Sequence, residues 1–286
     1  TCTLGHAHPA VVQAALAQIQ TLTHVSNLYY VPVQGELAKW LVEHSCADRV
    51  FFCNSGAEAN EGAIKLARKY AHTVLKIAEP IILTANASFH GRTLATITAT
   101  GQPKYQQNFT PLIPGFQYVP YNDFAAIEST VQALNGQVAA IMLEPLQGEG
   151  GVNPGQIEYF QQVRKLCDDK GILLILDEVQ VGMGRSGKYW GYEQLGIEPD
   201  IFTSAKGLGG GIPIGATLCK ESCNVFQPGD HASTYGGNPF VCAVALAVCQ
   251  TLERENILTN VHARGEQLRT GLAQLAVKYP KQIAQV

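Results

Sequence analysis

The sequence has little charge and no excess of either sign. Lys and Arg number 20 and Asp and Glu 23 among 286 residues, so the formal net charge is −3 and only 15% of the chain is charged, against about 25% in typical soluble domains. This balance offers no basic surface to a polyanion and argues against nucleic-acid binding. Because 46% of the residues are hydrophobic, we expect a large core and a surface partly buried against another subunit.

Long hydrophobic runs and paired-cysteine motifs are also missing. The longest apolar run covers residues 240–249, which is too short to span a bilayer. None of the eight cysteines stands in a Cys-x-x-Cys pair, so we expect reduced core thiols in the cytoplasm rather than a disulfide framework, although an organelle stays open. His6 and His8 lack further ligands at metal spacing, and we expect a turn there and no metal site.

Short apolar runs alternate with helical patterns along the chain. Helical spacing begins at Pro9, at Gly35, near Ser55, at Pro154 and again after Pro239. The apolar runs are hydrophobic throughout, as strands covered on both faces are, and they occupy residues 50–53, 81–84, 138–143, 172–176, 201–203 and 214–219. This alternation predicts an α/β fold with a parallel sheet between layers of helices.

Ligands bind at the carboxyl ends of strands in such sheets, so the residues that follow each strand carry the functional signal. After the strand at 50–53, Ser55, Gly56 and Ala57 lead directly into a helix. Their N–H groups and the helix dipole would suit a phosphate. An ordinary helix cap accounts for the same residues.

Two charged residues also follow strands. Asp177 ends the run at 172–176, where a buried carboxylate needs a cationic partner such as a protonated cofactor ring, unless it caps the next turn. Lys206 follows the run at 201–203 and opens a loop of four glycines. A partly desolvated lysine can form a Schiff base, whereas a lysine beside glycines is more often simply solvated.

Three further segments need an interpretation. Residues 231–239 place hydroxyl groups ahead of a helix, which suits an anion. Residues 89–92 combine an aromatic ring with a cation, as stacking on a flat ring and pairing with a carboxylate require. Residues 182–187 match the dinucleotide fingerprint G-x-G-x-x-G, but they do not follow their strand directly and no clear helix follows. We treat this last match as chance.

Together these segments resemble the class III pyridoxal-phosphate-dependent aminotransferases over essentially the whole chain. The segments occur in the family's order: Gly-His-Ala-His-Pro at 5–9, Asn-Ser-Gly-Ala-Glu-Ala at 54–59, Phe-His-Gly-Arg-Thr at 89–93, Glu-Pro-Leu-Gln-Gly-Glu-Gly-Gly at 144–151, Asp-Glu-Val-Gln at 177–180, the Lys206 loop and Ser-Thr-Tyr-Gly-Gly-Asn-Pro at 233–239. The resemblance implies the fold type I of these transferases, with a mainly parallel seven-stranded sheet and a second, smaller domain.

The resemblance also implies pyridoxal 5'-phosphate as cofactor, with Lys206 and Asp177 as the catalytic residues. Lys206 would form the Schiff base, and Asp177 would keep the ring nitrogen protonated. Thr234 would reach the phosphate in the other subunit, which implies a homodimer with shared sites. The other residues expected to bind the cofactor are Ser55, Gly56 and Ala57 at the phosphate, Phe89 and Val179 on the ring faces, His90 beside the ring and Gln180 at the ring hydroxyl.

Within the class, residues 26–30 and 89–93 are most similar to acetylornithine aminotransferases. Arg92 would then grip the α-carboxylate of N-acetyl-L-ornithine, Ser233 would touch the substrate, and Glu149 would gate an arginine beyond the chain. The implied reaction is ping-pong amino transfer to 2-oxoglutarate in arginine biosynthesis. It would give N-acetyl-L-glutamate 5-semialdehyde and L-glutamate, with Lys206 as base and acid.

Several alternatives remain at this point. Ornithine, succinylornithine or 4-aminobutyrate could be the amino donor, and the chain could be a non-catalytic truncated remnant. A nucleotide-dependent oxidoreductase, based on residues 182–187, is more distant. Because family members extend beyond both ends, we expect a fragment in which residues 1–30 are an N-terminal segment, 31–260 the large cofactor-binding domain and 261–286 the start of the small domain.

Overall fold

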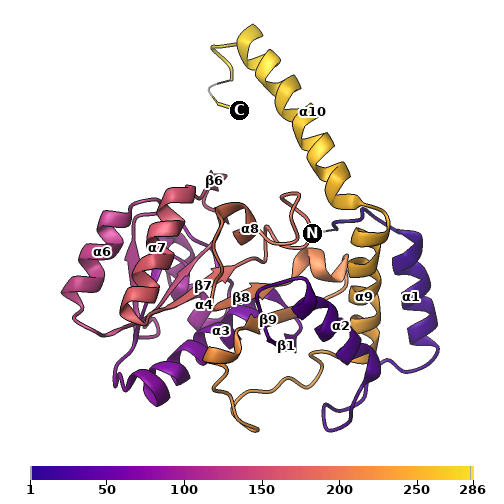
Figure 1. Ribbon diagram of the computed structural model, residues 1–286, viewed down its shortest axis with the longest axis horizontal. Helices are drawn as coiled ribbons and strands as arrows, with labels where there is room; N and C mark the ends of the chain where they lie inside the picture. The colour runs from indigo at the N-terminus through magenta and orange to yellow at the C-terminus, as the bar shows by residue number, and fades with distance from the viewer. Residues whose placement is uncertain (1, 284) are drawn as a thin grey trace.

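A seven-stranded sheet crosses the centre of the computed structural model, which describes residues 2–283 and 285–286 (Figure 1). The strand order is β1 (Arg49–Cys53), β9 (Gly215–Cys219), β8 (Ile201–Ser204), β7 (Leu173–Asp177), β4 (Val138–Leu143), β2 (Ile81–Ala85) and β3 (Phe116–Val119). The pairs from β8 to β3 are parallel, whereas β9 is antiparallel to both of its neighbours. The expected mainly parallel seven-stranded sheet is confirmed.

The apolar runs are hydrophobic throughout because both faces of the sheet are covered. In β7, Leu174 and Leu176 belong to one core, which also contains side chains of α2 (Pro32–Glu43), α7 (Ile157–Lys170) and α9 (Pro239–Arg254). The alternate residues Leu173 and Ile175 belong to a second core with α3 (Gly56–Tyr70) and α4 (Leu94–Ala99). Because side chains alternate between the two faces of each strand, they contribute to two separate cores.

Local sequence signals set the helix ends. Ser55 caps α3, with its Oγ accepting the N–H of Glu58 (3.2 Å), and Gly171 ends α7 in the left-handed region at φ 67°. The remaining helical elements are α1 (Pro9–Ile19), α5 (Pro103–Gln106), α6 (Phe124–Ala133), α8 (Tyr192–Leu195), α10 (Ile257–Lys278), the π-helical turn η1 (Ala71–Leu75) and the 3₁₀ turns η2 (Lys206–Gly209) and η3 (Glu221–Cys223).

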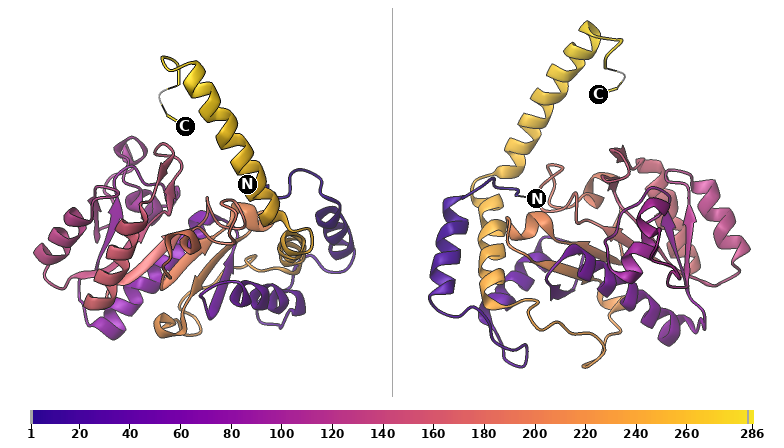
Figure 2. Two further views of the ribbon diagram at one scale, coloured as in Figure 1. Left: turned by 45° about the horizontal axis from the view of Figure 1, so that its top comes forward. Right: turned by 180° about the vertical axis from the view of Figure 1, so that it is seen from behind.

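The last helix stands apart from the rest of the chain. Helix α9 packs against both α1 and α2, whereas α10 projects away from the sheet and its helix layers (Figures 1 and 2). No residue of α10 is buried. The sheet and its covering helices are thus complete without α10.

The sequence locates six of the seven strands to within one residue of their bounds, and it misses β3. In β3 only Val119 is buried, so this edge strand has no continuous apolar run. A two-stranded hairpin, β5 (Leu146–Gln147) with β6 (Asn153–Pro154), is also absent from the expected elements. The second helix begins at Pro32 rather than Gly35, because Pro is well suited to the first turn.

The described residues bear on several other sequence interpretations. Residues 182–187 form turns, with no helix directly after them, so they lack the context of a dinucleotide fingerprint. All eight cysteines are free. Across residues 2–283 and 285–286, no cluster of metal-ligating side chains occurs and no helix is long and apolar enough to cross a membrane.

Candidate active site

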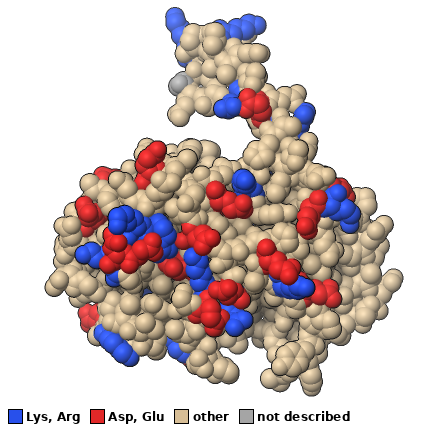
Figure 3. Space-filling view, in the orientation of Figure 1, with Lys and Arg blue, Asp and Glu red and all other residues tan. Residues whose placement is uncertain are grey.

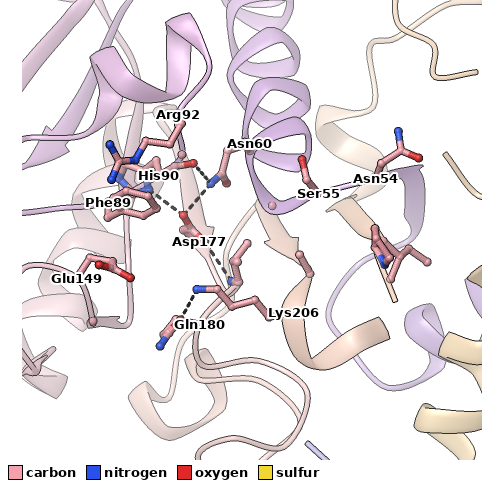
Figure 4. Close-up of a pocket in the computed structure, with 18 of the residues that line it drawn as sticks. Asn54, Ser55, Asn60, Phe89, His90, Arg92, Glu149, Asp177, Gln180 and Lys206 are labelled. Carbon is pink, nitrogen blue, oxygen red and sulfur yellow. Dashed lines mark hydrogen bonds and ion pairs between the residues drawn. The ribbon is translucent and has the colours of Figure 1, made fainter. Parts of the chain in front are cut away.

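A cavity of about 430 Å³ lies where β1, β7 and β8 end and α3 begins (Figure 4). It is the place that the parallel sheet predicts for a ligand. Of the site residues expected from the sequence, those that line it are Ser55, Gly56, Ala57, Phe89, His90, Arg92, Glu149, Asp177, Val179, Gln180 and Lys206.

Lys206 reaches the cavity from a strained turn. Its backbone adopts φ +38°, in the left-handed region that L-residues with side chains rarely occupy. The turn η2 begins here, directly after β8 and Ala205. The Nζ atom donates a hydrogen bond to Oε1 of Gln180, which follows the neighbouring strand β7 (Figure 4). The turn therefore brings the amine to the end of the strand that carries Asp177.

Asp177 is a buried carboxylate with three donors. Its side chain is only 5% exposed. The Oδ2 atom accepts hydrogen bonds from Asn60 Nδ2 (2.8 Å) and His90 Nδ1 (2.9 Å), and Oδ1 accepts from the N–H of Val179 (3.1 Å). These bonds offset the cost of burying the charge. The turn-capping role and the buried-acid role that the sequence left open are thus both present.

His90 is the buried ring that is hydrogen-bonded to Asp177. Burial lowers the pKa of its ring, but the hydrogen bond and charge of Asp177, with the charge of Glu144, outweigh burial and the pKa is raised. The Nδ1 atom is engaged with Asp177, while the buried Nε2 has no hydrogen-bond partner among the described residues. The Asp177 carboxylate thus favours the protonated form of the ring relative to a free imidazole.

The start of α3 is suited to an anion. The first N–H groups of a helix have no partner within it, and Ser55 Oγ takes up only that of Glu58. Gly56 leaves no room for a side chain, because a Cβ there would lie 2.9 Å from Val179 Cγ1. Backbone N–H groups and the helix dipole therefore face the cavity without an obstructing side chain.

Phe89 and Arg92 form the opposite wall. The Arg92 guanidinium lies 4.1 Å from the centre of the Tyr105 ring and 5.4 Å from that of Phe89, which holds the cation at the rim. The Phe89 N–H donates to Oε2 of Glu144 (3.1 Å). Burial raises the pKa of Glu144 to about 7.

Ser233 and Thr234 do not line this cavity. Ser233 lies just behind it, with its Oγ accepting a hydrogen bond from Asn54 Nδ2 (3.2 Å). Thr234 is exposed to solvent. A contact of Thr234 with a second subunit stays a prediction.

Asn60 and Glu144 are polar residues that line the cavity and for which the sequence predicted no role. Asn60 stands four positions after Gly56, one helical turn along the same face of α3. That spacing indicates the side of the helix on which Asn60 lies, but not its partners. Glu144 follows the buried strand β4 in the same manner as Asp177 follows its own apolar run.

Comparison with known proteins agrees with this geometry. The family model for class III aminotransferases matches residues 1–286. The chain belongs to the class III aminotransferases. Members of this family are pyridoxal-phosphate-dependent enzymes, so the cofactor inferred from the sequence is confirmed.

Its relatives include two named acetylornithine aminotransferase. The one from Nostoc sp. is 74% identical, and the match covers all of this chain and 68% of the relative's length. The one from Thermosynechococcus vestitus is 73% identical, and the match covers all of this chain and 70% of the relative's length. Among solved structures, the ornithine aminotransferase of Toxoplasma gondii is 35% identical with a TM-score of 0.92, covering 96% of this chain and 65% of its own. The N-acetylornithine aminotransferase of Stenotrophomonas maltophilia is 40% identical with a TM-score of 0.83, covering 98% and 68%.

The residues present suit pyridoxal phosphate. The open N–H groups at the start of α3 suit its phosphate, and the buried Asp177 carboxylate suits a protonated ring nitrogen. Lys206 supplies an amine and Phe89 an aromatic face within the same cavity. The glycine at position 56, packed against Val179, keeps the phosphate end free of side chains.

Proposed function

We propose that the protein transfers the amino group of N-acetyl-L-ornithine to 2-oxoglutarate. The observation that carries the proposal is the convergence of Lys206, Asp177 and the N-terminus of α3 on one cavity. The choice of donor is supported by relatives named acetylornithine aminotransferase that are up to 74% identical to this chain. The products would be N-acetyl-L-glutamate 5-semialdehyde and L-glutamate, as in arginine biosynthesis.

When bound, pyridoxal phosphate supplies an electron sink for the negative charge that develops at the reacting carbon. In our proposal Asp177 holds a proton at the ring nitrogen, because its buried carboxylate favours a cationic partner. Ser55, Gly56 and Ala57 bind the phosphate through backbone N–H groups at the start of α3. Phe89 and Val179 exclude water from the two ring faces.

Lys206 moves protons in this proposal. Its amine would hold the cofactor, and during the reaction it would serve as the base and acid that moves the proton at the reacting carbon. Gln180 accepts a hydrogen bond from the lysine and so orients Nζ in the absence of substrate. Its side chain would also form a hydrogen bond with the hydroxyl group of the cofactor ring. His90 holds Asp177 in place through the hydrogen bond between its Nδ1 and Oδ2 of the carboxylate.

Arg92 binds the α-carboxylate of the amino donor. It lines the cavity at the exposed rim, on the aromatic faces of Tyr105 and Phe89, and a guanidinium pairs well with a carboxylate. Glu149, which lines the same cavity, would gate an arginine of the active site, and Ser233 would touch substrate next to Asn54.

Initial rates test the choice of donor. At equal concentration and with 2-oxoglutarate as acceptor, we expect N-acetyl-L-ornithine to react fastest among N-acetyl-L-ornithine, ornithine, succinylornithine and 4-aminobutyrate. Double-reciprocal plots should give parallel lines, as a ping-pong reaction does. A higher rate with ornithine would favour the second candidate, which the structural match to the Toxoplasma gondii ornithine aminotransferase supports. Intersecting lines would exclude the mechanism.

The assembly and location are part of the same proposal. We infer a homodimer in which Thr234 of one subunit reaches the phosphate of the other, since Thr234 is exposed and away from its own cavity. We place residues 31–260 in the large domain and 261–286 at the start of a small one, which the projecting α10 supports. Eight free cysteines are consistent with the reducing cytoplasm.

A further inference from the structure

Asn60 joins several segments of the chain immediately behind the cavity. Its side chain is buried in α3, with the residue only 1% exposed. The Nδ2 atom donates to Asp177 Oδ2 (2.8 Å) and to the carbonyl oxygen of His90 (2.7 Å), and Oδ1 accepts from Thr203 Oγ1 (2.7 Å). Figure 4 shows the amide turned toward Asp177 and His90. Both ends of the amide are therefore engaged.

Asp177 and His90 decide which end of the amide faces them. The carboxylate and the carbonyl oxygen can only accept, so the NH₂ end points to them, and the Thr203 hydroxyl group donates to the remaining Oδ1 of Asn60. Thr203 is fully buried in β8, directly beside Asp177 in the β7–β8 register. Because every group in this network is buried, an altered orientation would leave a polar atom unpaired at substantial cost.

The hydrogen bonds leave Asp177 one free acceptor position. A carboxylate offers about four such positions. Asn60 and His90 engage Oδ2, and the Val179 N–H engages Oδ1. The remaining acceptor position therefore belongs to Oδ1.

We propose that Asn60, held in place by the Thr203 hydroxyl group, is a positioning residue. It fixes the Asp177 carboxylate so that the free acceptor of Oδ1 serves the ring nitrogen of the cofactor. By also binding the His90 carbonyl oxygen, Asn60 ties α3 to the segment that carries Phe89 and Arg92. This inference rests on the proposed role of Asp177 and does not depend on the amino donor.

Binding of two cofactor forms tests the role of Asn60 without any turnover. Pyridoxal phosphate can use Asp177, but deazapyridoxal phosphate, with a C–H in place of the ring nitrogen, cannot. We expect the wild-type protein to prefer pyridoxal phosphate and Asn60→Ala to reduce this preference about tenfold, because pyridoxal phosphate binding weakens more than binding of the deaza form. Thr203→Val, nearly isosteric, should reduce it in the same direction. Asp177→Asn lacks the carboxylate and shows how far the preference for pyridoxal phosphate falls when Asp177 cannot act.

Thr217→Val is the matched control. Thr217 is also a buried strand threonine against α3, but its Oγ1 donates to the carbonyl oxygen of Ala59 (2.7 Å) and not to Asn60. The preference should stay at the wild-type value in this variant. An equal loss of affinity for both cofactor forms in Asn60→Ala and Thr203→Val would show a merely structural role and overturn the inference.

The two possible failures can be told apart. If Asn60→Ala and Thr203→Val keep the full wild-type preference, Asn60 does not position Asp177, although the proposed function stands. If the wild-type protein binds both forms equally, or binds neither, the proposed role of Asp177 fails and the inference about Asn60 fails with it.

Discussion

Glu178 differs from its neighbour Asp177 although both are buried carboxylates. The oxygens of Glu178 accept the N–H groups of Gly191 and Tyr192, each at 2.8 Å. Burial raises its pKa to about 7 from a usual value of 4.5, in spite of those bonds. Asp177 instead accepts hydrogen bonds from the side chains of Asn60 and His90. The two acids therefore differ in their hydrogen-bond partners, backbone N–H groups for Glu178 and mainly side chains for Asp177.

The raised pKa of Glu178 predicts that its contribution to the stability of the protein changes with pH. The folded protein holds the Glu178 proton more tightly than the unfolded chain, so its contribution to the free energy of unfolding is present below pH 4.5 and is lost as the pH rises through about 7. Relative to wild type, Glu178→Gln should therefore become more stable by about 3 kcal/mol between the two limits. Urea unfolding at a series of pH values measures the difference. A difference that does not vary with pH would contradict the assignment.

At the scale of elements, the turn before α4 is held against the start of α3. Gly91 has φ +140°, and a Cβ there would lie 2.6 Å from Thr96 Oγ1 and 2.9 Å from Ala57 Cβ. The segment that carries Phe89 and the helix start that faces the cavity are thus in direct contact at a point where only glycine fits. Neither element can move without the other.

Gly91→Ala should therefore lower the free energy of unfolding more than replacement of a glycine in an open position. The matched control is Gly136→Ala, at φ +84° with nothing within 4 Å of its Cβ. Both variants adopt an unfavourable backbone conformation, but only Gly91→Ala also displaces α3, and we expect it to lose about 2 kcal/mol more. It should also bind pyridoxal phosphate more weakly. Denaturant unfolding and cofactor titration measure these effects, and equal costs for both variants would refute the contact.

Most of the strands that the sequence locates are buried at every position, namely β4, β7, β8 and β9. Strand β4, Val138–Leu143, is buried at every position and was found with its correct bounds. The antiparallel direction of β9 could not be read from its residues, because a strand buried on both faces looks the same in either direction. The strand order that places Thr203 beside Asp177 is likewise a long-range property.

At the scale of the whole molecule, charge and apolar surface are distributed differently. Acidic and basic side chains lie interspersed on the face shown in Figure 3, as the near-neutral composition predicts. Apolar side chains, by contrast, gather in the segment around Leu28, Tyr29 and Tyr30, which are 88%, 65% and 105% exposed. Neighbouring Asn27 contacts the backbone of Ser233 and Gly236. This surface adjoins Thr234 and is where we expect the second subunit.

Leu28→Asp should disrupt the homodimer. A charge buried in an apolar interface is costly, so the variant should sediment as a 30.8 kDa monomer where wild type sediments at twice that mass. The control is Val277→Asp, on α10, where the side chain is similarly exposed at 83%. Analytical ultracentrifugation compares the three proteins. Wild-type monomers, or equal effects of both substitutions, would contradict the proposed interface.

The sequence anticipated most of the site because its residues follow strands. Asp177, Lys206 and Gly56 each stand at a carboxyl end or the helix start after it, although each also had an ordinary explanation that only the family resemblance removed. The roles of Asn60 and Glu144 were not anticipated, because they depend on partners far apart in the sequence. Such hydrogen bonds are visible only in the folded chain.

The central claim is that Lys206 is the lysine that binds pyridoxal phosphate. Borohydride reduction of the cofactor-loaded protein, followed by mass spectrometry of its peptides, tests this claim directly. We predict that the reduced cofactor is attached to Lys206 in the wild-type protein. In Lys206→Ala, which keeps the other cavity-lining groups, we predict no attachment and a loss of turnover by orders of magnitude. Attachment to another lysine in the wild-type protein, or normal turnover of Lys206→Ala, would contradict the account.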